Sequence, residues 1–112
     1  MIEKVLLDYL NNNLPGIRAY MERPKNAPAK YVLIEKTGSG KEDHICSATF
    51  AFKSYADTLF EAASLNETVK EIVENSIELD EITRVRLNSD YNYTDTTEKK
   101  YRYQAVFDIK HY

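Results

Sequence analysis

The sequence predicts an α+β fold: a single antiparallel, or partly mixed, β-sheet of about four or five strands with two helices packed on one face. Two segments carry apolar residues at helical spacing, and several others alternate apolar and polar residues as half-buried strands do. Their order is α-β-β-β-α-β-β, and the hairpin-like spacing of consecutive strands favours antiparallel pairing. At 112 residues the chain is expected to form one domain spanning residues 1–112.

The first helix is predicted over about residues 2–12. Its apolar residues recur on one helical face, and the pattern stops at three consecutive asparagines before Pro15 and Gly16. Residues 17–22 alternate weakly, which predicts a short edge strand. Two prolines within residues 23–30 then predict a surface loop.

A hairpin is predicted next. Residues 31–36 are β-branched and aromatic, residues 37–41 read Thr-Gly-Ser-Gly-Lys and predict a turn, and residues 45–55 alternate as a strand. The alternation places Cys46, Ala48, Phe50 and Phe52 on one face.

The second half of the chain begins with a helix. Thr58 and Glu61 have the spacing of a capping box, and an apolar stripe continues to about Asn75. Residues 82–87 and 101–109 alternate and predict two further strands. The polar residues 88–100 between them are predicted to form a loop and hairpin tip.

Charge and cysteine content exclude some functions. The net charge of −3 and the pI of about 5.4 provide no basic field for gathering DNA, so tight DNA binding is disfavoured. The single cysteine, Cys46, cannot form an intramolecular disulfide, which is typical of a protein of the cell interior. Charges interrupt the first residues and every apolar run, so neither a secretion signal nor a membrane span is expected.

A phosphate-binding loop is the first candidate for chemistry, because Gly38-Ser-Gly-Lys41 resembles part of one. Such a loop needs glycine at position 35 and serine or threonine at position 42, and the chain has Glu35 and Glu42 there. A hairpin turn explains the glycines better.

His44 and Cys46 could offer two metal ligands on one strand face. Two ligands do not make a site, and Cys46 lies in an apolar pattern, so it is expected in the core with His44 at the exposed start of the strand. The many carboxylates include no pair that an apolar setting would single out for acid–base catalysis. We therefore expect no catalytic residue, cofactor or metal, and no enzyme activity.

The C-terminal tyrosines could form an aromatic platform for bases or sugars. The relevant residues are Tyr91, Tyr93, Tyr101 and Tyr103. Because the chain lacks the positive charge of a single-strand-binding groove, cross-strand packing or a protein interface is the favoured interpretation.

The chain as a whole resembles the small tail-terminator and head-tail joining proteins of long-tailed bacteriophages, the group that includes the lambda minor tail protein U. The resemblance rests on five segments: Arg18-Ala-Tyr-Met-Glu22, Tyr31-Val-Leu-Ile-Glu-Lys-Thr-Gly38, Ala62-Ala-Ser-Leu-Asn-Glu67, Leu87-Asn-Ser-Asp-Tyr-Asn-Tyr93 and Tyr101-Arg-Tyr-Gln-Ala-Val-Phe107. It covers essentially the whole chain.

This resemblance implies a structural virion protein, assembled in the bacterial host cytoplasm, that forms a homo-oligomeric ring at the head-proximal end of the tail. The ring, typically a hexamer, would end polymerisation of the tail tube protein and offer a surface to the head-tail connector or stopper protein. Genomic DNA would only pass through its lumen, and no membrane is involved. A head-completion or stopper protein is the nearest alternative. A small-molecule-binding regulatory α+β domain, or an enzyme with an unrecognised site, is a more distant one.

Subunit contacts are expected at exposed strand edges and at the polar loops 23–30, 37–43 and 88–100. The candidate interface residues are Lys41, Glu42, Tyr91, Tyr93, Asp95, Lys99 and Lys100.

Overall fold

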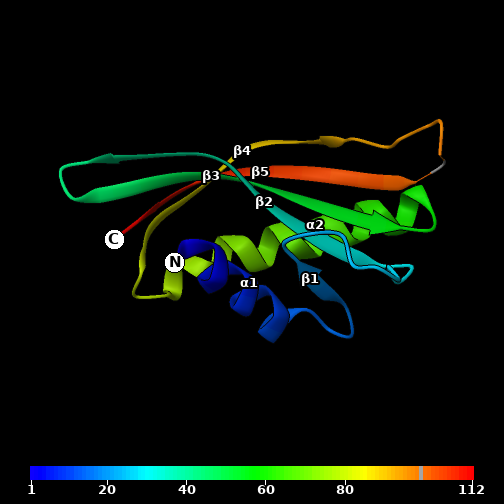
Figure 1. Cartoon of the computed structure of the whole chain (residues 1–112), viewed down its shortest axis with the longest axis horizontal. Helices are drawn as coiled ribbons and strands as arrows, with labels where there is room; N and C mark the ends of the chain where they lie inside the picture. The colour runs from blue at the N-terminus through cyan, green and yellow to red at the C-terminus, as the bar shows by residue number, and fades with distance from the viewer. Residues whose placement is uncertain (99) are drawn as a thin grey trace.

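The computed structural model describes residues 1–98 and 100–112 and contains two helices and one five-stranded sheet (Figure 1). The sheet has the order β1-β2-β3-β5-β4, and both helices cover the same face. The predicted order α-β-β-β-α-β-β is confirmed. In chain order the elements are α1 (Ile2–Asn13), β1 (Arg18–Tyr20), β2 (Tyr31–Glu42), β3 (Ile45–Ala56), α2 (Leu59–Asn75), the short 3₁₀ helix η1 (Ser76–Glu78), β4 (Ile82–Asn92) and β5 (Tyr101–His111).

The sheet is mixed rather than purely antiparallel, because β1 pairs with β2 in parallel. This pairing is short, joining only residues 18–20 to residues 31–33. The outer edge of β1 is occupied by a side chain of α1. Asn11 Oδ1 accepts a hydrogen bond from the Ala19 amide at 2.7 Å, and Asn11 Nδ2 donates to the Ala19 carbonyl at 3.2 Å. A single amide thus makes the two hydrogen bonds that a neighbouring strand would make there.

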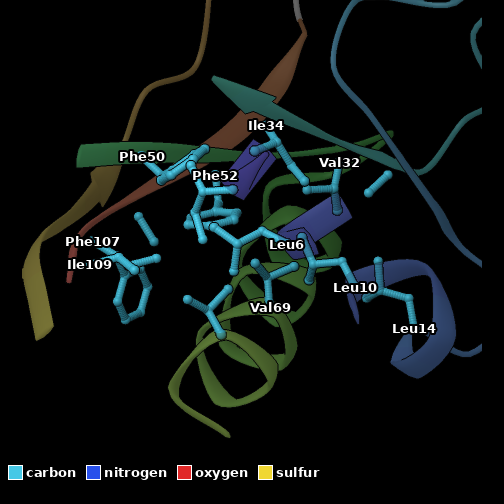
Figure 2. Close-up of a cluster of buried hydrophobic side chains, with 14 of the residues drawn as sticks. Leu6, Leu10, Leu14, Val32, Ile34, Phe50, Phe52, Val69, Phe107 and Ile109 are labelled. Atoms are coloured by element: carbon cyan, nitrogen blue, oxygen red, sulfur yellow. The ribbon is translucent and has the colours of Figure 1, made fainter. Parts of the chain in front are cut away.

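The core lies between the two helices and one face of the sheet (Figure 2). Its centre contains three fully buried phenylalanines, with Phe52 and Phe107 edge-to-face at 5.8 Å and Phe50 and Phe52 at 6.0 Å between ring centroids. The amphipathic stripes of the helices cover them, including Leu6 from α1 and Val69 from α2. Periodicity alone therefore predicted the packing face of each helix correctly.

The first hairpin is longer than the sequence predicted. Residues 37–41 are not a turn: β2 continues through them to Glu42, with a bulge between Lys36 and Gly38. The turn consists of Asp43 and His44, with φ values of 50° and 68°. This is the pair of positive φ values that a two-residue hairpin turn requires.

The second hairpin also extends beyond its predicted strands. The pairing of β4 with β5 reaches Asn92, and Asp95 bridges Lys100 before a turn over residues 96–98. The two hairpins project from opposite ends of the sheet (Figure 1) and give the chain principal dimensions of 44 × 25 × 24 Å. The molecule is therefore an elongated plate with two different ends.

Candidate functional site

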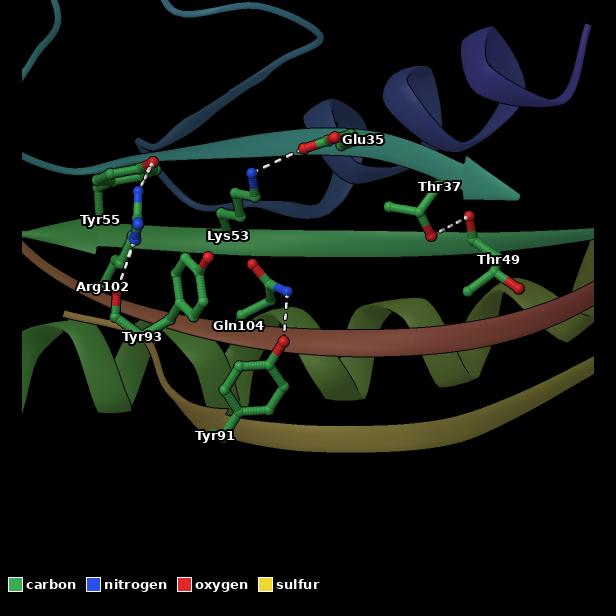
Figure 3. A network of polar contacts seen from close by, with 9 residues as sticks. All are labelled: Glu35, Thr37, Thr49, Lys53, Tyr55, Tyr91, Tyr93, Arg102 and Gln104. Atoms are coloured by element: carbon green, nitrogen blue, oxygen red, sulfur yellow. Dashed lines mark hydrogen bonds and ion pairs between the residues drawn. The ribbon is translucent and has the colours of Figure 1, made fainter. Parts of the chain in front are cut away.

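The face of the sheet opposite the helices carries a ladder of tyrosines and one arginine that crosses all five strands. Figure 3 shows four of its members: Tyr55, Arg102, Tyr91 and Tyr93. Because side chains alternate between the faces of a strand, these residues lie side by side on the face that α1 and α2 leave open. The ladder consists of Tyr20 of β1, Tyr31 of β2, Tyr55 of β3, Arg102 of β5, Tyr91 of β4, and Tyr93 just after β4.

Arg102 joins the two halves of this ladder. Its Nη1 donates to the Tyr55 hydroxyl at 3.0 Å, its Nε donates to the Tyr93 carbonyl at 2.6 Å, and its guanidinium carbon lies 4.3 Å from the Tyr93 ring centroid. At the β2–β3 side of the ladder, the inner side, the rings of Tyr31 and Tyr55 stack with their centroids 4.6 Å apart. Burial raises the pKa of the Tyr31 hydroxyl. On the outer side Tyr91 and Tyr93 are 39% and 46% exposed. The ladder is rigid inside the sheet and accessible at the end near the second hairpin.

The four C-terminal tyrosines do not form one platform. Asn92 pairs with Tyr103, which places Tyr103 and Tyr101 on the helix-covered face and Tyr91 and Tyr93 on the open face. Tyr91 instead accepts a hydrogen bond from Gln104 at 2.6 Å. Arg102 was not among the residues predicted from the sequence. The alternation of β5 does indicate that Arg102 lies on the strand face opposite to Tyr101 and Tyr103.

The predicted interface residues fall into two groups at opposite ends of the sheet. Lys41 and Glu42 end β2 at the first hairpin, while Tyr91, Tyr93, Asp95 and Lys100 belong to the second hairpin. Lys41 pairs with Cys46 of β3, which in turn pairs with His111 of β5. Tyr91 pairs with Gln104 of β5. These two β5 positions are about 24 Å apart along the strand. Lys99 lies outside the described residues.

Cys46 is only partly buried, which corrects its assignment to the core. It does lie on the helix-facing side of β3, but the first hairpin extends past the start of α1, so the helices do not cover it. His44 is exposed, as predicted, but belongs to the turn. Within the described residues, no group of three or more His, Cys, Asp or Glu side chains is arranged to hold a metal ion.

A polar cluster ties α2 to β4. Asp90 accepts hydrogen bonds from Asn66 Nδ2 at 2.6 Å and from Lys70 Nζ at 2.5 Å, and Lys70 also pairs with Glu67 at 2.8 Å. The bonds to Asp90 and, second, to Glu67 raise the pKa of the Lys70 ammonium, and burial opposes them only in part. The cluster holds the edge strand β4 against the helix layer.

Replacing Asp90 with alanine is expected to lower the free energy of unfolding by about 1–2 kcal/mol at neutral pH, because the Asn66 amide and the Lys70 ammonium lose their shared acceptor. Since the pKa of Lys70 is raised by folding, the part of this stabilisation that comes from Lys70 is complete below the ordinary lysine pKa of 10.5 and is lost as the pH rises through the higher folded-state pKa, whereas the part from Asn66 remains. Urea unfolding of both proteins at neutral and alkaline pH measures it.

Glu67→Ala is the matched control, because the Glu67 side chain is 71% exposed while that of Asp90 is 24% exposed. It should cost much less. Equal losses for the two variants would contradict the role of Asp90.

No protein-family model matches the chain, and no curated protein matches it significantly. Among the described residues, no helix is both long and apolar enough to span a membrane.

Proposed function

We propose that this protein is a structural subunit of a phage or phage-derived tail, forming a ring at the head-proximal end of the tube. The observation that carries the proposal is the presence of two different free sheet edges on one elongated plate. A closed ring of identical subunits needs two unlike, complementary surfaces on each subunit, since every copy contacts its neighbours head to tail.

The first free edge belongs to β2. Because β1 pairs only with residues 31–33, the rest of β2 has no strand beside it on that side within the described chain. Lys36 and Lys41 lie on this stretch, and such charges keep an edge from pairing indiscriminately while leaving it open to a specific neighbour.

The second free edge is β4, which ends the sheet on the other side over residues 82–92. It is longer and more exposed than β1, whose edge is already occupied by Asn11. The two edges available to neighbours therefore face opposite sides of the plate. This arrangement supports addition of one neighbour on each side.

In this function the ring would end growth of the tail tube and present its outer surface to the head-tail connector or stopper. The phosphate backbone of genomic DNA would pass through the lumen without tight binding, as a net charge of −3 per subunit favours. The ladder of the open face and the second hairpin would supply contacts to these protein partners, since tyrosine and arginine are enriched at interfaces.

Deleting the gene from the phage or prophage that carries it tests the proposal by electron microscopy of the particles. Overlong tubes without heads are expected. Tails of normal length that lack heads would reassign the protein to a stopper or joining role. Intact, infectious virions would refute the structural function altogether.

A further inference from the structure

Phe60 is the most exposed aromatic side chain among the described residues, at 81%, and its neighbour Leu59 is 41% exposed. Both lie in the first turn of α2, where Thr58 caps the helix by accepting a hydrogen bond from the Glu61 amide at 3.1 Å. The cap fixes the direction of this turn, so Phe60 is held out from a rigid element. Phe60 and Leu59 together form a small exposed apolar patch, and aromatic residues are enriched at the centres of protein interfaces.

A pocket that could receive Phe60 as an anchor lies on the helix-covered face of the sheet, at the end opposite to this residue. It measures about 400 Å³ and is bordered by Ile2 at the start of α1, by Cys46 and Ala48 of β3, and by Lys41 and His111 at its rim. The pocket lies where the first hairpin extends past the start of α1 (Figure 1). Its volume and its apolar lining residues are compatible with an aromatic side chain.

The anchor and the pocket cannot meet within one subunit. α2 begins just after Ala56, whereas the pocket surrounds Cys46, and β3 extends about 34 Å between these positions. Figure 1 shows α2 starting at the end of the sheet that carries the second hairpin, away from the first hairpin. The anchor of one copy is therefore available only to another molecule.

We propose that Phe60 of one subunit inserts into the pocket around Cys46 of the next subunit. This inference rests on the proposed ring and names its head-to-tail contact. Charge supports a second copy as the occupant, because exposed Asp57 precedes the anchor while two lysines, Lys36 and Lys41, line the pocket. One aromatic side chain buries only about 150–250 Å², so this contact acts together with the edges of β2 and β4.

Cross-linking to the native cysteine tests the contact, since Cys46 is the sole cysteine. In a Leu59→Cys variant the new thiol lies next to Phe60, which is retained. A short bis-maleimide is applied to the concentrated protein and to particles assembled with it, and linked peptides are identified by mass spectrometry. We expect cross-links between position 59 of one subunit and position 46 of the next, which join the subunits into trimers and larger species.

Two controls use the same reagent: the first keeps both thiols and removes Phe60, and the second moves the introduced thiol. Leu59→Cys combined with Phe60→Ser should give at least tenfold less 59–46 product, and Glu74→Cys, toward the other end of α2, should give none above background. A product that stops at dimers would show a two-fold contact and overturn the head-to-tail arrangement. Product that is absent, or equal with and without Phe60, would overturn the anchor.

Failure of this contact and failure of the proposed function are separable. If Leu59→Cys particles keep normal tails and heads but give no 59–46 product, the ring uses other surfaces and the tail function stands. If gene deletion leaves virions intact, the ring function itself fails, whatever cross-links form in concentrated protein.

Discussion

Replacing Phe52 with alanine is expected to lower the free energy of unfolding by about 3–5 kcal/mol. The Phe52 side chain has no exposed surface and packs against Phe50 and Phe107 at the centre of the core. Its removal leaves a cavity that the surrounding strands, paired on both sides, cannot close. Since small domains are stable by about 5–15 kcal/mol, the variant should lie close to unfolding at ambient temperature. Urea titration followed by circular dichroism measures the difference.

Phe60→Ala is the control for this prediction, because it removes the same atoms from an 81% exposed position. It should change the free energy of unfolding by less than about 0.5 kcal/mol. A large loss of stability for Phe60→Ala would show that this side chain packs within the subunit. A small loss for Phe52→Ala would show that the core is looser than described.

Replacing Arg102 with leucine is expected to cost about 2–3 kcal/mol. The change removes the hydrogen bonds to the Tyr55 hydroxyl and the Tyr93 carbonyl, together with the contact between the guanidinium and the Tyr93 ring. Because Arg102 is the link between the inner and outer tyrosines, near-ultraviolet circular dichroism should change together with the denaturation midpoint. The helices lie on the other face and should keep their far-ultraviolet signal.

Arg102→Lys separates charge from geometry. A lysine keeps the positive charge but cannot donate in the planar fork that reaches both tyrosines, so most of the loss should remain. Full stability of the lysine variant would mean that charge alone matters. Full stability of the leucine variant would mean that the ladder contributes nothing to folding.

Local signals in the sequence predicted the helices well. The Thr58 cap and the apolar stripe of α2 depend only on neighbours within a few residues, and the structure has the helix over Leu59–Asn75. The parallel pairing of β1 with β2 was not predicted, because it depends on where the loop over residues 21–30 returns and on the anchoring of Ala19 by Asn11. Both are tertiary contacts.

Hairpin length was harder to predict, because glycine has more than one structural use. Gly38 and Gly40 suggested a turn, but Gly40 lies opposite Ser47, where a Cβ would approach the serine Oγ to 3.1 Å. The actual turn consists of Asp43 and His44. Both residue types tolerate positive φ, but they also occur widely outside turns, so they do not mark a turn in the sequence. The wrong prediction for Cys46 has the same cause, because the burial of Cys46 depends on how far the hairpin extends past α1.

The order of the strands also bears on how fast the chain folds. The hairpins β2–β3 and β4–β5 each close over a short turn, but the β3–β5 pairing that unites them joins residues as distant along the chain as Cys46 and His111. Closing that long loop costs entropy before the core contacts can compensate for it. The two hairpins are therefore expected to form first and to dock along β3 and β5 in the slow step. During that interval the inner edges of both hairpins are unpaired, and misassociation between chains competes most strongly with folding.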